Sequence, residues 1–355
     1  MDKPVRPETL PGNSRPNIER PVTGGNVERP GIGNLPGGTQ RPGVTRPGNT
    51  RPGATTRPID VGSINLGLNN KISARPNWVS INSNRMISIN NRWQTQIAGI
   101  QNWPTRYPAR INYWHHWGDG VRYHWGHHYH NWFGRDWWYS HHHHWCGWHY
   151  GYWFNRYPWG YWWSTPSYAS CVNWFTWTAT PGVWAQPIYY DYGQGGNVVY
   201  QDNSVYINGQ QVASADEFAQ SAMELATVPP PENEEVAAAA EWMPLGTFAV
   251  SSDEKDVEPT RTIQLAVNKD GVISGTLYNS QSDQAYSVQG QVDKQTQRVA
   301  FRVGDSDKVV VETGLYNLTQ DEAPALVHYG ADHVENWLLV RLQNSEAEEA
   351  AATPE

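Results

Sequence analysis

The last third of the chain alternates apolar and polar residues in a series of short runs, a period of two that is typical of β-strands with one buried face. The apolar sides of three of these runs are Ile263, Leu265 and Val267; Tyr286, Val288 and Val292; and Val299, Phe301 and Val303. About eight such runs, joined by short loops, lie between Gly246 and Leu342, with Gln, Ser or Arg on their other side. The pattern predicts an antiparallel up-and-down β-barrel, and a sandwich of the same strands is the alternative.

Further upstream the spacing of apolar residues changes to three and four, which is typical of helices. The residues that follow it are Met86, Ile89, Trp93, Ile97 and Ile100. We therefore expect a helix that begins at Ser83 as N-cap and that Pro104 ends. A short helix is expected after Pro108, and another over about 121–132.

After residue 136 the helical period is lost, because glycines and prolines recur at short intervals. We expect irregular loops packed through aromatic rings in this stretch. A short apolar helix is then predicted over about 166–176, where Ser164, Thr165 and Pro166 have the chemistry of a helix start.

A β-hairpin followed by a helix is predicted next. Residues 197–201 and 205–208 have strand character, and Asp202-Asn203 and Asn208-Gly209 are turn pairs. The helix is expected over about 215–227, since Ser214 and Glu217 have the spacing of a capping box.

The first 60 residues repeat an Arg-Pro unit eight times, at Arg6, Arg15, Arg20, Arg29, Arg41, Arg46, Arg51 and Arg57. Proline and glycine without a recurring apolar face cannot offset the entropy of ordering. We expect a disordered spacer, and binding of an anionic wall polymer by the arginines is the alternative.

These patterns predict an α+β multidomain chain. Its parts are a disordered Arg-Pro-Gly tail (1–60), a helical and irregular His/Trp/Tyr-rich module (75–188), a β-hairpin–helix connector (189–227), a Pro/acidic/Ala linker (228–241), the barrel (242–343) and a disordered acidic tail (344–355).

The net charge of −8 is unevenly distributed along the chain. Residues 1–60 carry nine basic and five acidic groups (+4), residues 61–204 nine and four (+5), and residues 205–355 eight and 25 (−17). A basic front and an acidic rear favour an anionic partner for the front half. Nucleic acid is not expected, because the arginines of the tail are isolated.

Eleven of the 13 histidines lie between Tyr113 and Trp163. They could coordinate Zn²⁺, Cu²⁺ or Ni²⁺, since helical spacings of three and four place pairs of them on one face. The candidate ligands are His124, His127, His128, His130, His141, His142, His143, His144, Cys146 and His149, with His115 and His116 nearby. The alternatives are adventitious metal binding and aromatic packing without a metal.

Sixteen of the 20 tryptophans lie between Trp103 and Trp184. Their rings could form a stacked core, a glycan-binding or adhesive surface, or a membrane-interface layer. No apolar run is long enough for a transmembrane helix. No motif of a common enzyme class is present, which predicts a protein without enzymatic activity.

The two cysteines, Cys146 and Cys171, lack the spacing of a zinc site, and a disulfide between them and two free thiols both remain open. The oligomeric state cannot be predicted from the sequence.

Several long motifs resemble a family of bacterial cell-surface proteins often labelled mu-protocadherin-like, although nothing here resembles a cadherin repeat. The motifs are YDYG-x-x-GNVVYQDNSVYINGQQVAS from Tyr190, WMPLGTFAV from Trp242, TGLYNLTQDEAPALVHYG from Thr313 and NWLLVRL from Asn336, within residues 75–343. Members carry a signal sequence ahead of the Arg-Pro-Gly tail, whereas Met1 opens on MDKPVRPETLPG. The resemblance implies export to the cell surface or periplasm, with an upstream start or a processed fragment.

The barrel pattern also resembles avidin and streptavidin. The matching stretches are Gly271-x-Ile273-Ser274-Gly275-Thr276, Tyr286-x-Val288-x-Gly290, Glu312-Thr313-Gly314 and Trp337-Leu338-Leu339. The likeness implies the fold alone, because Leu277, Asn279 and Glu312 stand where that family places biotin-contacting side chains.

Taken together, the sequence predicts a non-enzymatic envelope or cell-surface protein with a structural or adhesive role, in contact with a cell-wall or matrix polymer or glycan. Transition-metal sequestration by the histidines is the alternative function.

Overall fold

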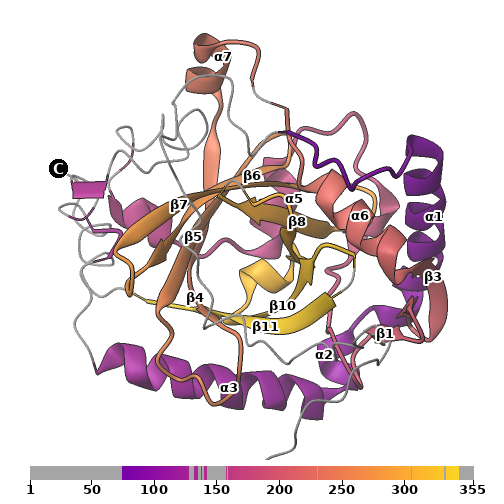
Figure 1. Cartoon of the computed structure of the whole chain (residues 1–355), viewed down its shortest axis with the longest axis horizontal. Helices are drawn as coiled ribbons and strands as arrows, with labels where there is room; N and C mark the ends of the chain where they lie inside the picture. Colours follow the sequence, from indigo (N-terminus) through magenta and orange to yellow (C-terminus); the bar gives the residue numbers. More distant parts are fainter. Residues whose placement is uncertain are drawn as a thin grey trace, which may run out of the picture. The chain divides into compact units, whose positions relative to one another are not determined.

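Eight consecutive strands of the C-terminal region close into an antiparallel β-barrel (Figure 1). They follow one another in chain order, and the last strand pairs with the first, with Leu338 opposite Ser251. The predicted barrel is confirmed and the sandwich is wrong. The strands are β4 (Trp242–Ser251), β5 (Arg261–Asn268), β6 (Val272–Asn279), β7 (Gln284–Val292), β8 (Arg298–Val303), β9 (Val309–Gly314), β10 (Glu322–Tyr329) and β11 (His333–Arg341).

The structure is a computed structural model that describes residues 74–127, 132–134, 137, 140–141, 157, 159–229, 231–304, 306–331 and 333–343. All of them belong to one unit, Thr55–Glu355. The predicted tails at 1–60 and 344–355 lie outside the described residues.

The barrel interior is filled by the apolar side of each strand. Leu265, Val288 and Phe301 are among the side chains that point inward, and each is at most 1% exposed. Since successive side chains of a strand alternate between two faces, the intervening residues point outward.

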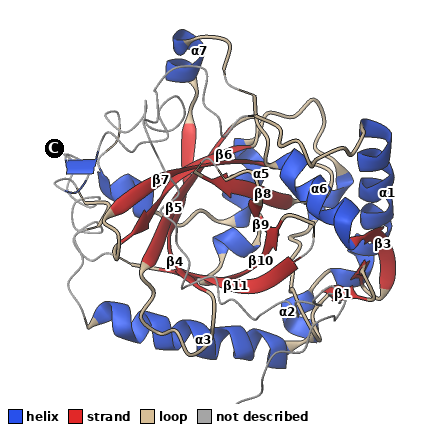
Figure 2. Cartoon of the chain, viewed as in Figure 1, coloured by secondary structure: helices blue, strands red, loops and turns tan. Residues whose placement is uncertain are grey.

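The outward-facing residues of the strands are also buried. Gln264 and Ser274 are 0% exposed and Arg298 is 1% exposed, although the sequence pattern places them on the polar side. Other parts of the chain therefore cover the outside of the barrel. Figure 2 shows helices α1, α3 and α6 around the strands.

One part of the outer surface, over β8 to β10, lies under α1 (Ser83–Ile100), a three-stranded sheet and α6 (Ala215–Leu225). The sheet consists of β1 (Val198–Gln201), β2 (Ser204–Ile207) and β3 (Gln210–Ser214). Trp93 and Phe218 pack there in one cluster with Ala300 of the barrel. We call this side the connector face.

The other part of the outer surface lies over β4 to β7 and β11. Here α3 (Pro108–Gly126) and the 3-10 helix η4 (Trp159–Trp163) supply Trp114, Trp117 and Trp162, which pack in one cluster with Ala249 and Leu338 of the barrel. Small outward-facing residues leave room for large rings. We call this side the indole face.

One end of the barrel is plugged by α5 (Tyr168–Trp174) and the 3-10 helix η5 (Gly182–Ala185). Cys171, Phe175 and Trp184 from this segment belong to the same cluster as the barrel interior. The indole Nε1 of Trp184 donates to the carbonyl of Lys294 at 2.7 Å, so the plug is bonded to the β7–β8 turn. The opposite end is surrounded by the β4–β5, β6–β7, β8–β9 and β10–β11 loops.

The two predicted turns of the connector are present. Asp202 and Asn203 have φ values of 50° and 56°, and Asn208 and Gly209 have 51° and 77°, the left-handed conformation of tight hairpin turns. The second turn leads into β3, so the connector is a three-stranded sheet rather than a hairpin. The capping box of Ser214 and Glu217 is confirmed at the start of α6.

Several predicted helix boundaries are wrong. Asn82 rather than Ser83 caps α1, because its side-chain oxygen accepts from the amide of Arg85 at 2.9 Å. The helix already ends at Ile100, and Pro104 lies in the first turn of the next helix, α2 (Trp103–Arg106). This fits the tolerance of a first turn for a residue without an amide hydrogen.

The two helices expected after Pro108 form one helix, α3, which ends at Gly126. Of the remainder of the helix predicted over 121–132, residues 127 and 132 lie in turns and residues 128–131 lie outside the described residues. The helix predicted over 166–176 is shorter, because it begins at Tyr168 with Ser167 as cap and ends at Trp174.

The predicted boundary near Trp242 does not separate two structural units. Trp242 is 1% exposed and packs with Trp162 of η4 and Leu338 of β11. The linker before it contains a short helix, α7 (Glu234–Ala239). The helical module and the barrel share their cores, since both supply buried residues to the indole-face cluster.

Candidate functional site

The described histidines among the predicted metal ligands lie apart and contact other groups. His124 Nε2 lies 3.2 Å from the carboxylate of Glu258. The ring of His127 contacts that of Tyr123 in a tilted arrangement, with ring centroids 4.1 Å apart. His141 stacks on Trp137 at 4.3 Å, and its Nε2 lies 3.3 Å from Asp283.

The other predicted ligands, His128, His130, His142, His143, His144, Cys146 and His149, lie outside the described residues. Within the described ranges, no group of three or more His, Cys, Asp or Glu side chains is arranged to hold a metal ion. His115, expected near the cluster, instead pairs through Nδ1 with Glu322 of β10.

Residues 61–118 contain no Asp or Glu, so the arginines of this stretch can form ion pairs only with acidic groups elsewhere in the chain. Arg75 pairs with Glu224 at 2.9 Å and Arg85 with Glu217 at 2.6 Å. These two arginines of the positive front half, which was expected to attract an anionic partner, thus contact acidic groups of the same chain.

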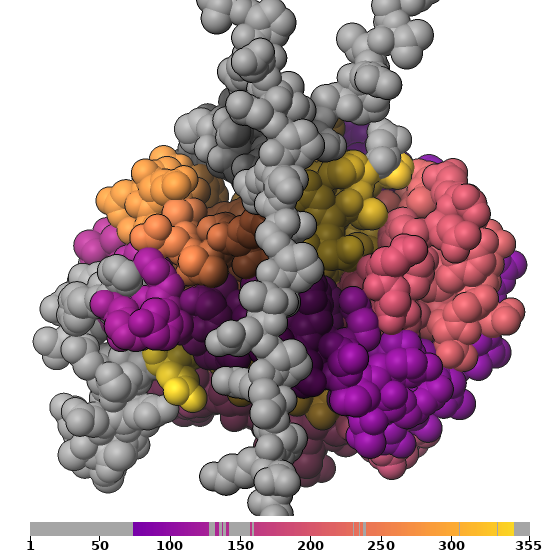
Figure 3. Space-filling view, turned by 90° about the horizontal axis from the view of Figure 1, so that it is seen from below, coloured from indigo at the N-terminus to yellow at the C-terminus, as the bar shows by residue number. Residues whose placement is uncertain are grey.

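Asp191 of the YDYG motif is the most highly coordinated of these acids. Its carboxylate is 0% exposed and accepts from Nε and Nη2 of Arg110 at 3.0 and 2.8 Å. The indoles of Trp103 and Trp114 donate to it at 3.0 and 2.9 Å. One carboxylate thereby joins α2, α3 and the connector, whose surfaces adjoin in Figure 3.

A second buried charge cluster lies on the connector face. Arg298 donates to Glu312 through Nη2 at 2.8 Å and Nε at 3.2 Å, and the guanidinium lies 4.1 Å from the ring centroid of Trp93. His328 Nε2 lies 3.5 Å from the same carboxylate. Burial alone raises the pKa of Glu312, but Arg298 and His328 outweigh it and hold that pKa below its usual range.

Most tryptophans in the described ranges are core residues rather than surface residues. Trp93 and Trp162 are 0% exposed, and Trp103, Trp114 and Trp117 are at most 6% exposed. Among the large exposed side chains, Tyr123 of α3 is 71% exposed. This arrangement agrees with the stacked-core interpretation of these rings.

Cys171 is a free thiol buried in the plug, where burial raises its pKa to about 12. Cys146, its candidate partner, lies outside the described residues.

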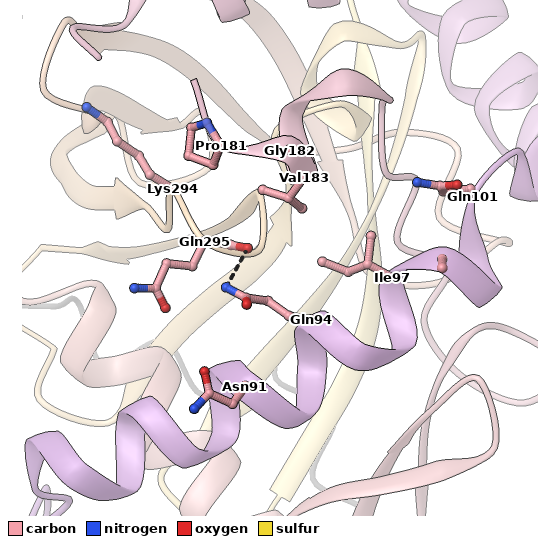
Figure 4. Close-up of a pocket in the computed structure, with 10 residues that line it drawn as sticks. Asn91, Gln94, Ile97, Gln101, Pro181, Gly182, Val183, Lys294 and Gln295 are labelled. Atoms are coloured by element: carbon pink, nitrogen blue, oxygen red, sulfur yellow. Dashed lines mark hydrogen bonds between the residues drawn. The ribbon is translucent and has the colours of Figure 1, made fainter. Parts of the chain in front are cut away.

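A surface groove of about 520 Å³ lies between α1, the plug and the β7–β8 turn (Figure 4). Its α1 wall carries Asn91, Gln94 and Ala98, which share one helical face because they are spaced by three and four. Gln101, the C-cap residue that follows α1, also lines the groove. The remaining lining residues are Ile97, Pro181, Gly182, Val183, Lys294 and Gln295. We call it the amide groove.

The side-chain amides of Asn91 and Gln101 make no hydrogen bond within the described part of the chain, and both residues point to the groove in Figure 4. Gln94 donates to the carbonyl of Gln295 at 3.3 Å, which connects the two walls. A carboxamide both donates and accepts, so the groove offers both kinds of partner to a ligand.

Lys294 forms the charged end of the groove. Its ammonium lies over the rings of Phe175 at 5.3 Å and Trp177 at 5.2 Å and contacts the carbonyl of Thr176 at 3.4 Å. Burial lowers its pKa.

The sequence reasoning missed this groove. In the sequence the groove is indicated only by the spacing of the amides at 91, 94 and 101 beside the apolar stripe of α1. The same spacing is typical of an ordinary solvated helix face. The other wall comes from residues far along the chain, and only the closed barrel brings them next to α1.

No helix in the described part of the chain combines the length and apolar character needed to cross a membrane. Comparisons of this chain with protein-family models, with curated proteins and with solved structures found no match.

Proposed function

We propose that the protein is an exported, non-enzymatic component of the bacterial envelope that binds a hydroxyl-rich matrix or cell-wall glycan in the amide groove. The observation that carries the proposal is the set of four carboxamides, Asn91, Gln94, Gln101 and Gln295, around one groove. The resemblance to bacterial cell-surface proteins supports the location.

The lining matches the chemistry of a neutral sugar chain. Hydroxyl groups both donate and accept, as carboxamides do. Ile97, Pro181 and Val183 supply apolar surface for the C–H faces of the rings.

The same lining favours binding over hydrolysis. Glycoside hydrolases use two carboxyl groups on either side of the scissile bond. The groove presents amides and one ammonium instead, groups that hold a ligand in place and are poor proton donors and acceptors at neutral pH.

The contact surface differs from the one expected from composition. The described tryptophans of the module are largely internal, so their role in binding is to hold α1 and the plug in position against the barrel. Polar amides of α1 make the contact.

Binding of the full chain to purified peptidoglycan sacculi and to insoluble polysaccharides tests the proposal in a co-sedimentation titration. The variants Asn91→Ala and Gln101→Ala are each expected to weaken binding about 2- to 10-fold, the value of one neutral hydrogen bond. Gln96→Ala is the matched control, because this amide lies on α1 outside the groove and donates to Thr95. Equal binding by all three variants contradicts the assignment of the groove.

Cell fractionation tests the location separately. We expect the native protein in the envelope or extracellular fraction, and recovery of the intact protein from the cytosol contradicts export.

A further inference from the structure

The two ends of the barrel differ in chemistry. The plugged end is mainly apolar and aromatic, with Cys171, Phe175 and Trp184 in the interior cluster, and the buried guanidinium of Arg341 there donates to backbone carbonyls of Leu245 and Leu318. The opposite end carries charged and hydroxyl-bearing side chains on the inward side of the strands. We call this group, Arg261, Tyr329, Glu335 and Trp337, the mouth cluster.

The strand pattern explains why the mouth cluster points inward. Arg261 has the same parity on β5 as Ile263 and Leu265, and both of those residues belong to the interior core. Trp337 has the parity of Leu339 on β11, which is also interior. β4 lies between β5 and β11, so the contact between Arg261 and Trp337 reaches across the inside of the barrel.

The guanidinium of Arg261 lies over the indole of Trp337, with its central carbon 4.4 Å from the ring centroid. Stacking on an aromatic face fixes the plane of a guanidinium and leaves the N–H edges available. The only hydrogen bond of this guanidinium within the described residues is a long one of 3.5 Å from Nη2 to Ser252 Oγ.

No carboxylate of the described residues forms an ion pair with Arg261. Burial lowers the pKa of Arg261, and the more distant Tyr329, Asp256 and Glu335 oppose that change through their charge. A guanidinium has five N–H donors, so this partly buried cation keeps N–H groups available for a further acceptor.

The nearest candidate partner, Glu335, is already bonded to other groups. Its carboxylate accepts from Trp337 Nε1 at 3.0 Å and from the Tyr329 hydroxyl at 3.3 Å, and it lies 3.1 Å from His333 Nε2. These contacts hold Glu335 at the edge of the indole, whereas Arg261 lies on its face.

Solvent reaches this end of the barrel. The Glu335 side chain is 22% exposed and His333 is 59% exposed. Tyr329, Val303 and Val309 are half-buried beside them and pack on the interior core. Below this rim Val288, Phe301 and Leu339 fill the interior and are at most 1% exposed, so a ligand can enter only as far as the mouth.

We propose that the mouth cluster binds the carboxylate group of a small organic acid, with Arg261 as its cation and Trp337 as the support that fixes the guanidinium. Guanidinium and carboxylate match in a two-hydrogen-bond fork. The apolar rim formed by Val303 and Val309 contacts the body of the acid. The site is separate from the amide groove and does not depend on it.

Acetate and its neutral isostere acetamide test the proposal on the full chain labelled with ¹⁵N in its tryptophan indoles. The Trp337 indole resonance is assigned by its loss in Trp337→Phe. Acetate is expected to shift this resonance saturably, and acetamide is expected to leave it unchanged at equal concentration. Absence of a saturable shift with acetate overturns the proposal.

The variant Arg261→Gln is expected to weaken acetate binding at least about 10-fold, since charge-assisted hydrogen bonds are lost. Arg106→Gln, which removes a guanidinium stacked on Tyr107 at the surface, is the control that retains binding. Arg261→Lys keeps the charge without the fork and is expected to give intermediate affinity. Should Arg261→Gln bind acetate as the native chain does with unchanged near-ultraviolet circular dichroism, the site is wrong.

Discussion

The connector face and the indole face cover the same barrel with different chemistry. On the connector face the barrel presents the buried ion pair of Arg298 and Glu312, and the guanidinium of Arg298 lies over the ring of Trp93. On the indole face it presents small apolar residues such as Ala249 and Ala266, which meet tryptophan rings. The indole face is held mainly by the apolar area that the buried rings remove from water. On the connector face, directional contacts between charged groups fix one position of the covering elements on the barrel.

The largest effect is expected from breaking the charge contact of the connector face. Glu312→Ala leaves the guanidinium of Arg298 buried without its carboxylate, which costs about 3–5 kcal/mol of the free energy of unfolding. Urea denaturation measures this loss in the free energy of unfolding. Replacing both partners by apolar residues, Arg298→Met with Glu312→Leu, is expected to recover most of the loss. A loss below about 1 kcal/mol for Glu312→Ala contradicts the role of the charge contact.

A smaller effect is expected from overfilling the indole face. Ala266 is 0% exposed beneath the rings, so Ala266→Leu forces the cover away from the strands and costs about 1–3 kcal/mol in urea denaturation. The control Ala109→Leu places the same side chain on an exposed position of α3 and is expected to change stability by less than about 0.5 kcal/mol. Equal values for the two variants contradict tight packing of the rings on the barrel.

The smallest effect is expected at the surface pair of Arg85 and Glu217. Hydrogen bonding with Arg85 lowers the pKa of Glu217 to about 2 from its ordinary 4.5. A lowered pKa means that the pair stabilises the fold above pH 4.5 and that this stabilisation is lost as the pH falls from 4.5 to about 2. Because both side chains are about one-third exposed, we expect the ion pair to contribute only about 0.2–1 kcal/mol to the free energy of unfolding.

Arg85→Gln separates this effect from other acid-sensitive contacts. Unfolding is measured between pH 5 and pH 2 for both chains. The native chain is expected to lose its small advantage over Arg85→Gln across this range, and a constant difference at all pH values contradicts the assignment.

The barrel could be predicted from the sequence because its signal is local. In the strand that contains Ile263, Leu265 and Val267, the inward-facing side can be recognised from a few neighbouring residues. The turn pair Asn208-Gly209 and the capping box at Ser214 are local signals as well.

The burial of the outer face could not be predicted, because Gln264 and Arg298 look like solvent-facing residues until their covers are known. Their partners are distant in the chain, as Trp93 is from Arg298. The amide groove was missed for the same reason, since Gln94 and Gln295 meet only in the folded unit. The charge asymmetry was visible in the sequence. The acidic groups that form ion pairs with Arg75, Arg85 and Arg110, however, belong to the same chain rather than to a separate partner.

The pairing of β11 with β4 has a consequence for biosynthesis. The ring closes through residues such as Leu338 and Val340, which are among the last of the unit to leave the ribosome. Until then Trp162 of η4 and the other rings of the indole face have no finished surface to pack on. Folding that waits for such distant contacts is slow and leaves apolar surface exposed during synthesis. We therefore expect a truncation before Leu338 to remove the surface on which the earlier residues pack.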